Sequence, residues 1–304
     1  MFQKIKPHLK WVIPLVVIVI LLVLFVVSQN SKIISATVSP EVIIKGQNQE
    51  ITITAVIKPR GIIPPVIFVT LSEPKKVEDY NTFKGNSTWL GLLKKSTKDN
   101  SGNYIYQRTF NLNHSKAETV QVQLRNFVGF FIYPTVQTDS TIVWPITLPT
   151  LRLAVTTRSF SLPQDPGEEG KKTLAGVDSD NDGVRDDIQR EIFFAFPESE
   201  RVRKALGLQW SARQNQIENS TDKDIVDIKE IQSYRATTCL YGVLNDIQHQ
   251  RYEKVLRAIE NVIYNTTKRG NGYDQFQKIV KLQPYQIPNE GVKNCDFDWQ
   301  SLPD

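Results

Sequence analysis

Histidine and cysteine, on which many catalytic and metal sites depend, are scarce in this sequence. The 304 residues include three histidines and two cysteines. A Ser-His-Asp hydrolase needs a histidine beside its nucleophile, yet neither His114 nor His249 lies in a nucleophile motif. The sequence contains no GxSxG, HExxH, GxGxxG or phosphate-binding loop, and no two cysteines have the CxxC spacing typical of zinc sites. These absences argue against common hydrolases, nucleotide-binding enzymes and zinc proteins.

A concentration of positive charge is lacking as well. Lysine and arginine number 37 against 32 acidic residues, but Lys4, Lys6 and Lys10 precede the first apolar segment and account for much of the excess. The rest of the chain is nearly neutral, and its basic runs, such as Lys94-Lys95, are short. A nucleic-acid-binding surface needs clustered lysine and arginine, so we expect no nucleic-acid partner.

One long apolar run does occur, from Trp11 to Val27, without a charged residue. At about 1.5 Å per residue it would cover roughly 26 Å, close to the ~30 Å hydrocarbon core of a bilayer. The lysines before it place the N-terminus in the cytoplasm by the positive-inside rule. The sequence therefore predicts a cytoplasmic stub and transmembrane anchor over residues 1–32, membrane contact through residues 11–27, and a bulk that is periplasmic or extracellular. A cleaved signal peptide is the alternative, although this run exceeds the usual length of about 7 to 15 residues.

The two cysteines, Cys239 and Cys295, both follow the predicted anchor. An oxidising compartment would favour a disulfide between them. The bridge would close a loop of about 56 residues and stabilise the fold by about 4 kcal/mol if it acts through chain entropy. Two separate buried thiols are the alternative interpretation.

Short apolar runs with alternating polar residues fill residues 33–157. In Glu50–Ile57 the apolar side chains alternate with threonines, which is typical of a strand with one buried face. Further strands are expected near 34–38, 42–45, 65–71, 89–93, 104–112, 119–124 and 141–146. Short strands at this spacing, separated by turn residues, predict an all-β sandwich.

The same residues resemble a family. The order ATVSPEVIIKGQ, EITITAVI, VIFVTLSE, WLGLLKK, NSGNYIYQRTF and ETVQVQLR resembles the immunoglobulin-like and fibronectin-III-like modules of bacterial envelope proteins. The resemblance implies an immunoglobulin-like β-sandwich that serves as a spacer or binding scaffold, because such a fold specifies no function by itself.

The stretch DSDNDGVRDDIQ, residues 178–189, carries the most specific chemistry of the sequence. Aspartates at positions 1, 3 and 5 with glycine at position 6 can converge hard oxygens on Ca²⁺. The stretch resembles the calcium loops of EF-hands, dockerins and thrombospondin type 3 repeats, but Gln189 replaces the bidentate glutamate of position 12, so weaker binding is expected. An aspartate-rich turn that caps the next helix without metal is the alternative. The expected ligands of a structural Ca²⁺ are Asp178, Asp180, Asp182, the Val184 carbonyl, Asp186 and Gln189.

Around this stretch the pattern changes from strands to helices. Residues 158–176 are rich in proline, glycine and charge, which predicts a linker. Residues 177–304 have a helical period, with helices expected near 184–196, 198–215, 224–247, 252–263 and 273–281. The opening VDSDNDGVRDDIQREI and the later CLY, YNTTKR and NCDFD resemble a group of uncharacterised exported bacterial proteins. That resemblance implies a cysteine pair and an envelope location, and no known activity.

Together these patterns predict a multidomain α+β protein with an N-terminal transmembrane helix, an all-β immunoglobulin-like sandwich and a small all-α bundle. The expected function is that of a non-enzymatic, membrane-anchored structural or binding protein that engages an unidentified envelope or surface protein. A cell-wall or glycan hydrolase, or an accessory to one, is an alternative that would use paired carboxylates such as Asp296 and Asp298. A subunit of a secretion or pilus assembly is another.

Overall fold

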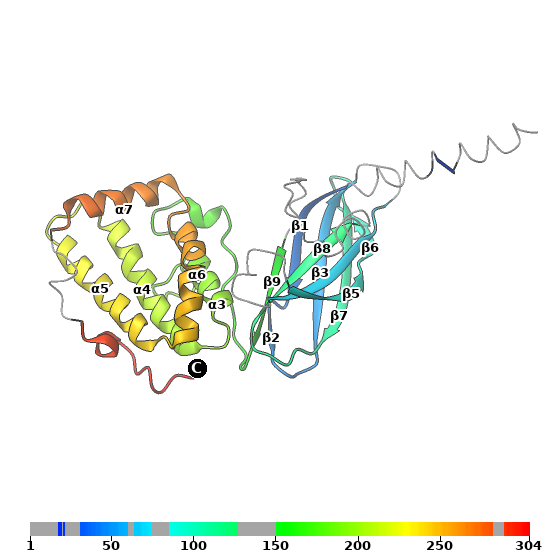
Figure 1. Ribbon diagram of the computed structural model, residues 1–304. Coiled ribbons are helices and arrows are strands. Elements are labelled where there is room, and N and C mark those ends of the chain that lie inside the picture. Colours follow the sequence, from blue (N-terminus) through cyan, green and yellow to red (C-terminus); the bar gives the residue numbers. More distant parts are fainter. Residues whose placement is uncertain are drawn as a thin grey trace, which may run out of the picture.

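The computed structural model describes residues 18, 19, 21, 31–59, 64–74, 85–126, 150–281 and 289–304. Two β-sheets formed by residues 31–156, the sheet region, are followed by α-helices within residues 177–304, the helical region. Figure 1 shows the two regions side by side, with helix α3 and strands β2 and β9 nearest their boundary.

The first sheet has four antiparallel strands in the order β1-β3-β7-β6. The second has five in the order β2-β9-β8-β4-β5, and within it β2 runs parallel to β9. The strands of the first sheet are β1 (Lys32–Ser39), β3 (Gln49–Lys58), β6 (Lys94–Lys98) and β7 (Tyr104–Leu112). Those of the second are β2 (Val42–Ile44), β4 (Ile67–Pro74), β5 (Gly85–Leu92), β8 (Thr119–Asn126) and β9 (Thr150–Thr156).

One apolar core lies between the sheets. Strand β3 buries every second residue completely, including Ile51, Ile53 and Ile57, because successive side chains of a strand point to opposite faces. The same cluster takes in Val122 and Leu124 of β8 in the other sheet. The sheets are therefore two layers of one unit.

The predicted fold class needs correction in the sheet region. An immunoglobulin-like sandwich is built from two antiparallel sheets, whereas β2 pairs with β9 in parallel. Alternation along a strand fixes which of its faces is buried but leaves the choice of partner open. The immunoglobulin-like assignment is therefore not retained, and the predicted strand at 141–146 lies outside the described residues.

The predicted membrane location is also corrected. In the part of the chain that the structure describes, no helix combines the length and the apolar content needed to cross a membrane. The expected anchor at residues 11–27 lies outside the described residues except for positions 18, 19 and 21. The structure thus gives no support to a single-pass protein with a cytoplasmic N-terminus and a periplasmic or extracellular bulk.

The helical region contains α3 (Asp186–Ala195), α4 (Glu200–Glu218), α5 (Val226–Val243), α6 (Asp246–Ile263) and α7 (Thr267–Ile279). The sequence predicted one helix through 224–247, but α5 ends at Val243 and α6 begins at Asp246. The reason is a capping box: the Asn245 side chain accepts from the Gln248 backbone N–H, and the Gln248 side chain accepts from the Asn245 backbone N–H. These bonds satisfy N–H groups that a helix start leaves free.

The C-terminal segment, residues 289–304, packs along α5. A disulfide joins Cys239 of α5 to Cys295, with 5.0 Å between their Cα atoms. Gly242 lies directly beneath Val292, since a Cβ atom at Gly242 would come within 2.8 Å of the Val292 backbone nitrogen. At the far end, the Asp304 carboxylate accepts hydrogen bonds from the Ser199 hydroxyl at 2.7 Å and the Gln248 amide at 2.6 Å. The segment is thus held at both ends.

Polar and aromatic contacts join the two regions. Arg152 of β9 makes two 2.6 Å hydrogen bonds to Glu191 of α3, and Arg190 of α3 makes two to Glu41 at 2.7 and 2.8 Å. Both guanidinium groups lie over the ring of Phe194, which is buried at 3% exposure. We call this set of contacts the joint.

The segment 158–176, predicted as a linker, is irregular in backbone but tied to the helical region. Arg269 of α7 is completely buried and donates to the carbonyls of Gly170, Thr173 and Leu174. At the start of the segment, near the sheet region, Phe160 stacks on Phe193 of α3 with 4.4 Å between ring centroids.

Candidate metal site and the adjoining pocket

The aspartate-rich stretch forms a compact loop that ends in α3. Asp178, Asp180 and Asp186 each offer a carboxylate oxygen, and these three oxygens lie within 4.8 Å of one another. Asp186 is the first residue of α3 and is buried at 2% exposure. Three of the six predicted ligands are therefore brought together by this turn.

Internal hydrogen bonds hold the loop in this shape. Asp178 accepts from the backbone N–H groups of Asp182 and Gly183 at 3.2 and 3.0 Å. Asp186 accepts from the Ser179 N–H at 2.9 Å. Gly183 has φ of +84°, a backbone conformation that glycine adopts without the steric cost other residues meet. This φ value explains why glycine suits position 6 of the loop, where the chain turns sharply.

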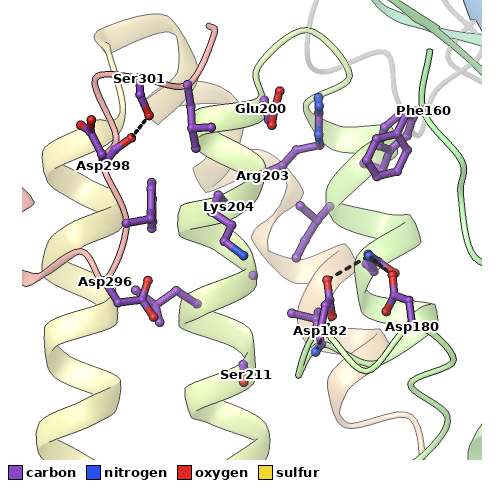
Figure 2. Close-up of a pocket in the computed structure, with 18 of the residues that line it drawn as sticks. Phe160, Asp180, Asp182, Glu200, Arg203, Lys204, Ser211, Asp296, Asp298 and Ser301 are labelled. Carbon is purple, nitrogen blue, oxygen red and sulfur yellow. Dashed lines mark hydrogen bonds between the residues drawn. The ribbon is translucent and has the colours of Figure 1, made fainter. Parts of the chain in front are cut away.

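Gln189, at position 12 of the loop, lies against two carboxylates. Its amide nitrogen donates to Asp180 at 3.1 Å and to Asp182 at 3.0 Å. The dashed lines that reach these two aspartates in Figure 2 mark the two bonds. The amide oxygen of the same side chain is buried and has no hydrogen-bond partner. A buried acceptor without a partner is costly. The –NH₂ group thus occupies a position between the two carboxylates where a cation would be favoured.

The two carboxylates experience opposite environments. The hydrogen bond from Gln189 is the largest influence on Asp180 and lowers its pKa. Burial is the largest influence on Asp182 and raises its pKa, and the charges of Asp180 and Asp178 act in the same direction. Lys204 of α4 opposes this shift. Negative charge in the loop is therefore only partly balanced by the surrounding protein.

Two acidic neighbours of the predicted ligands, Asp187 and Glu191, have other partners and do not complete the ligand set. Asp187 pairs with the buried Arg185 at 2.7 Å and accepts from Asn265. Glu191 pairs with Arg152 in the joint. Val184, expected to offer its carbonyl, packs its side chain toward Gly207 of α4. The hard oxygens of Asp178, Asp180 and Asp186 fit a Ca²⁺ ion.

A cavity of about 650 Å³ adjoins the loop. Figure 2 shows Asp180 and Asp182 on one side of it, Lys204 and Ser211 of α4 behind it, and Asp296 and Asp298 on the opposite side. Its apolar lining includes Phe160, Ile192, Phe193, Leu208, Phe297 and Leu302.

The cavity cannot be located from the sequence. Asp296 and Asp298 are visible there as a pair of carboxylates, but nothing local indicates that they face Asp180 and Asp182, more than 100 residues earlier in the chain. The disulfide brings the C-terminal segment against the helices. The predicted Cys239–Cys295 pairing was the one available signal that the two parts of the chain are close.

Comparison with known proteins shows no family. No protein family and no curated protein matches the chain. Among solved structures, a Pseudomonas fluorescens alkylpurine DNA glycosylase, AlkC, bound to DNA containing an abasic site analog, is 14% identical with a TM-score of 0.21. The match covers 31% of this chain and 26% of that protein, so the chain spans about a quarter of its length. Similarity at this level carries no argument about function.

Proposed function

We propose that this chain is a non-enzymatic binding protein in which the loop of residues 178–189 holds one structural Ca²⁺. The observation that carries the proposal is the approach of the Asp178, Asp180 and Asp186 oxygens to within 4.8 Å of one another. The place of Gln189 supports it, because this side chain lies against Asp180 and Asp182 at the position where calcium loops supply their last ligand.

Ca²⁺ fits this donor set better than other common ions. It accepts six to eight oxygen ligands at about 2.3–2.6 Å in flexible geometry, and carboxylate oxygens are what the loop offers. Mg²⁺ demands a stricter octahedron and retains water. Without a bidentate glutamate at position 12, affinity in the range of about 10⁻⁴–10⁻³ M is expected.

The ion would stabilise the start of α3 and, through it, the joint. Asp186 begins this helix, and four or five residues later Arg190 and Glu191 make the bidentate ion pairs with Glu41 and Arg152. A fixed first turn of α3 keeps Arg190 and Glu191 in position for their ion pairs with the sheet region. The role of the ion would be structural. It would help to hold the sheet region and the helical region together, while the partner binds elsewhere on the surface.

Thermal unfolding of the whole chain tests the proposal. In metal-depleted buffer with added CaCl₂ we expect the melting temperature to rise, since an ion at 100 times its Kd stabilises by about 2.7 kcal/mol. The rise should be smaller with MgCl₂. Asp180→Asn should abolish the calcium-dependent rise.

Asp165→Asn is the matched control, because Asp165 is exposed and accepts from a backbone N–H two residues on, at Gly167, outside the loop. It should retain the full calcium response. A wild-type protein that melts identically with and without Ca²⁺ would disprove the site, and so would an Asp180→Asn variant that keeps the response.

A further inference from the structure

The cavity beside the loop is strongly acidic on two facing sides. Asp180 and Asp182 lie on the α3 side, and Asp296 and Asp298 lie on the C-terminal segment. Glu200, at the start of α4, adds a fifth carboxylate to the lining. Two acidic surfaces separated by a cavity would bind a ligand with two positive charges better than a ligand with one.

The basic residues of the cavity leave most of this charge unbalanced. Arg203 donates to the Phe196 and Pro197 carbonyls at 2.8 and 2.9 Å and lies over the Phe193 ring at 4.9 Å. Its guanidinium is therefore already engaged by the protein. Lys204 is the other basic residue of the lining. Glu200 also pairs with Arg158 at 3.8 Å, but the four aspartates against Lys204 still leave an excess of negative charge, so an anionic ligand is disfavoured.

The space between the acidic sides is apolar in part. Leu208 of α4, Phe297 and Leu302 line it, and Phe160 offers a ring that is 38% exposed. A bare metal ion would gain nothing from such surfaces, whereas a methylene chain would bury apolar area there.

The acidic side formed by the C-terminal segment is held in place before any ligand arrives. The Cys239–Cys295 disulfide fixes one end of it, and the hydrogen bonds of Asp304 to Ser199 and Gln248 fix the other. A binding site whose walls are already ordered loses less entropy on binding. This favours a formed site over a surface that closes around its ligand.

We infer that this cavity binds a linear organic dication, a diamine or polyamine, with its ammonium groups at the two acidic sides and its methylene chain between them. One acidic side of the cavity, Asp180 and Asp182, belongs to the loop of the proposed calcium site, so bound Ca²⁺ would weaken diamine binding there. Asp296 and Asp298 lie outside that loop, and variants at these two positions test the inference separately.

Isothermal titration of the full chain with 1,5-diaminopentane and spermidine, in metal-depleted buffer, tests the inference. We expect saturable binding to one site, and about tenfold weaker binding of pentylamine, which has the same chain and one charge. The double variant Asp296→Asn/Asp298→Asn should weaken diamine binding by about tenfold or more. It should leave the calcium-dependent rise in melting temperature unchanged.

The matched control is Asp222→Asn/Asp224→Asn, an exposed pair with the same spacing outside the cavity. Asp222 accepts from the backbone two residues on, as Asp298 does, so this variant should bind diamine like the wild type. Equal affinity for diamine and pentylamine would overturn the inference, as would an absence of saturable binding, preferential binding of inorganic phosphate, or equal losses in the two double variants. The comparison of diamine with pentylamine uses the wild-type protein alone, so it tests the inference even if a variant does not fold. A wild-type protein that binds diamine but melts identically with and without Ca²⁺ would overturn the calcium proposal alone.

Discussion

Arg269 is the largest side chain that is completely buried in the described residues. Burial is the main influence that lowers its pKa, and the charge of Arg185 acts in the same direction. It remains inside because its guanidinium donates to the carbonyls of Gly170, Thr173 and Leu174 and to the Asn265 side chain. A single residue thus satisfies the backbone of a segment that has little regular structure of its own.

We therefore expect Arg269→Met to lower the free energy of unfolding by about 3 kcal/mol, because the buried carbonyls lose their donors. Urea denaturation measures the change. Arg257→Met, on the exposed face of α6, is the control and should stay within about 0.5 kcal/mol of the wild type. Equal effects of the two substitutions would show that the hydrogen bonds to residues 170–174 contribute little.

Gln189 permits a second prediction at this scale, which rests on the proposed calcium site. Gln189→Glu restores the carboxylate that calcium loops have at position 12, and affinity depends on the number of charged ligands. We expect Ca²⁺ to bind about tenfold more tightly, which corresponds to ~1.4 kcal/mol. Without Ca²⁺ the variant should be less stable than the wild type, since Asp180 and Asp182 lose the –NH₂ donor.

Isothermal titration calorimetry with CaCl₂ measures the affinity of each variant and tests this prediction. Gln189→Leu has a side chain of similar length without the amide and should weaken binding. If the glutamate variant binds Ca²⁺ no better than the leucine variant, residue 189 is not a ligand.

At the scale of elements, the sequence predicted individual strands and helices better than their partners. The alternation in 50–57 and the turn at Gly183 have local causes and were visible in the residues. Strand β6, Lys94–Lys98, was missed because all its side chains are exposed and no alternation marks it. The α5–α6 boundary was missed because a capping box at Asn245 interrupts a run that is otherwise helical.

The cavity could not be predicted for a different reason. Its lining comes from segments near residues 160, 180–193, 200–211 and 296–302. No segment by itself contains a pattern that indicates a binding site. Only the packing of these segments around α4 brings their carboxylates to the same cavity. Local sequence patterns are sufficient to predict the loop, whereas the cavity depends on contacts between residues far apart in the sequence.

The C-terminal segment gives a prediction about acid. Burial tends to raise the pKa of Asp304, but hydrogen bonds from Gln248 and Ser199, together with the charge of Arg201, outweigh burial and lower it. A carboxyl group with a lowered pKa in the folded state stabilises the protein above its ordinary value of 3.8, and this contribution is lost as the pH falls through the lowered value.

We expect the free energy of unfolding to fall below about pH 3.8 more steeply in the wild type than in Asp304→Asn, which has no proton to gain. Urea denaturation between pH 2.5 and 6 measures both curves. If the two curves run parallel over this range, Asp304 does not anchor the segment by its charge.

At the scale of the whole molecule, the joint determines whether the two regions behave as one body. Phe193 and Phe194 of α3 form a cluster with Ala154 of β9, and the Thr119 hydroxyl donates to the Phe194 carbonyl at 2.6 Å. These contacts couple the regions through both apolar area and polar bonds.

Phe194→Ala should therefore lower the free energy of unfolding by about 3–5 kcal/mol, as expected for a buried aromatic side chain, and should separate the melting of the two regions. Scanning calorimetry would then show two transitions where the wild type shows one. Ile247→Ala, at a side chain that is 69% exposed, is the control and should keep a single transition. One transition in both variants would mean that the regions are coupled by other contacts.

The Cys239–Cys295 bridge also determines how the chain would respond to a pull on its two ends. The covalent path runs from α5 directly into the C-terminal segment, so α6 and α7 lie in a closed ring of sequence separation 56 that carries no tension. At roughly 3.4 Å per extended residue, about 190 Å of contour length stays hidden until the bridge is reduced. An oxidised molecule under load would extend only outside this ring, while its last two helices remained mechanically shielded.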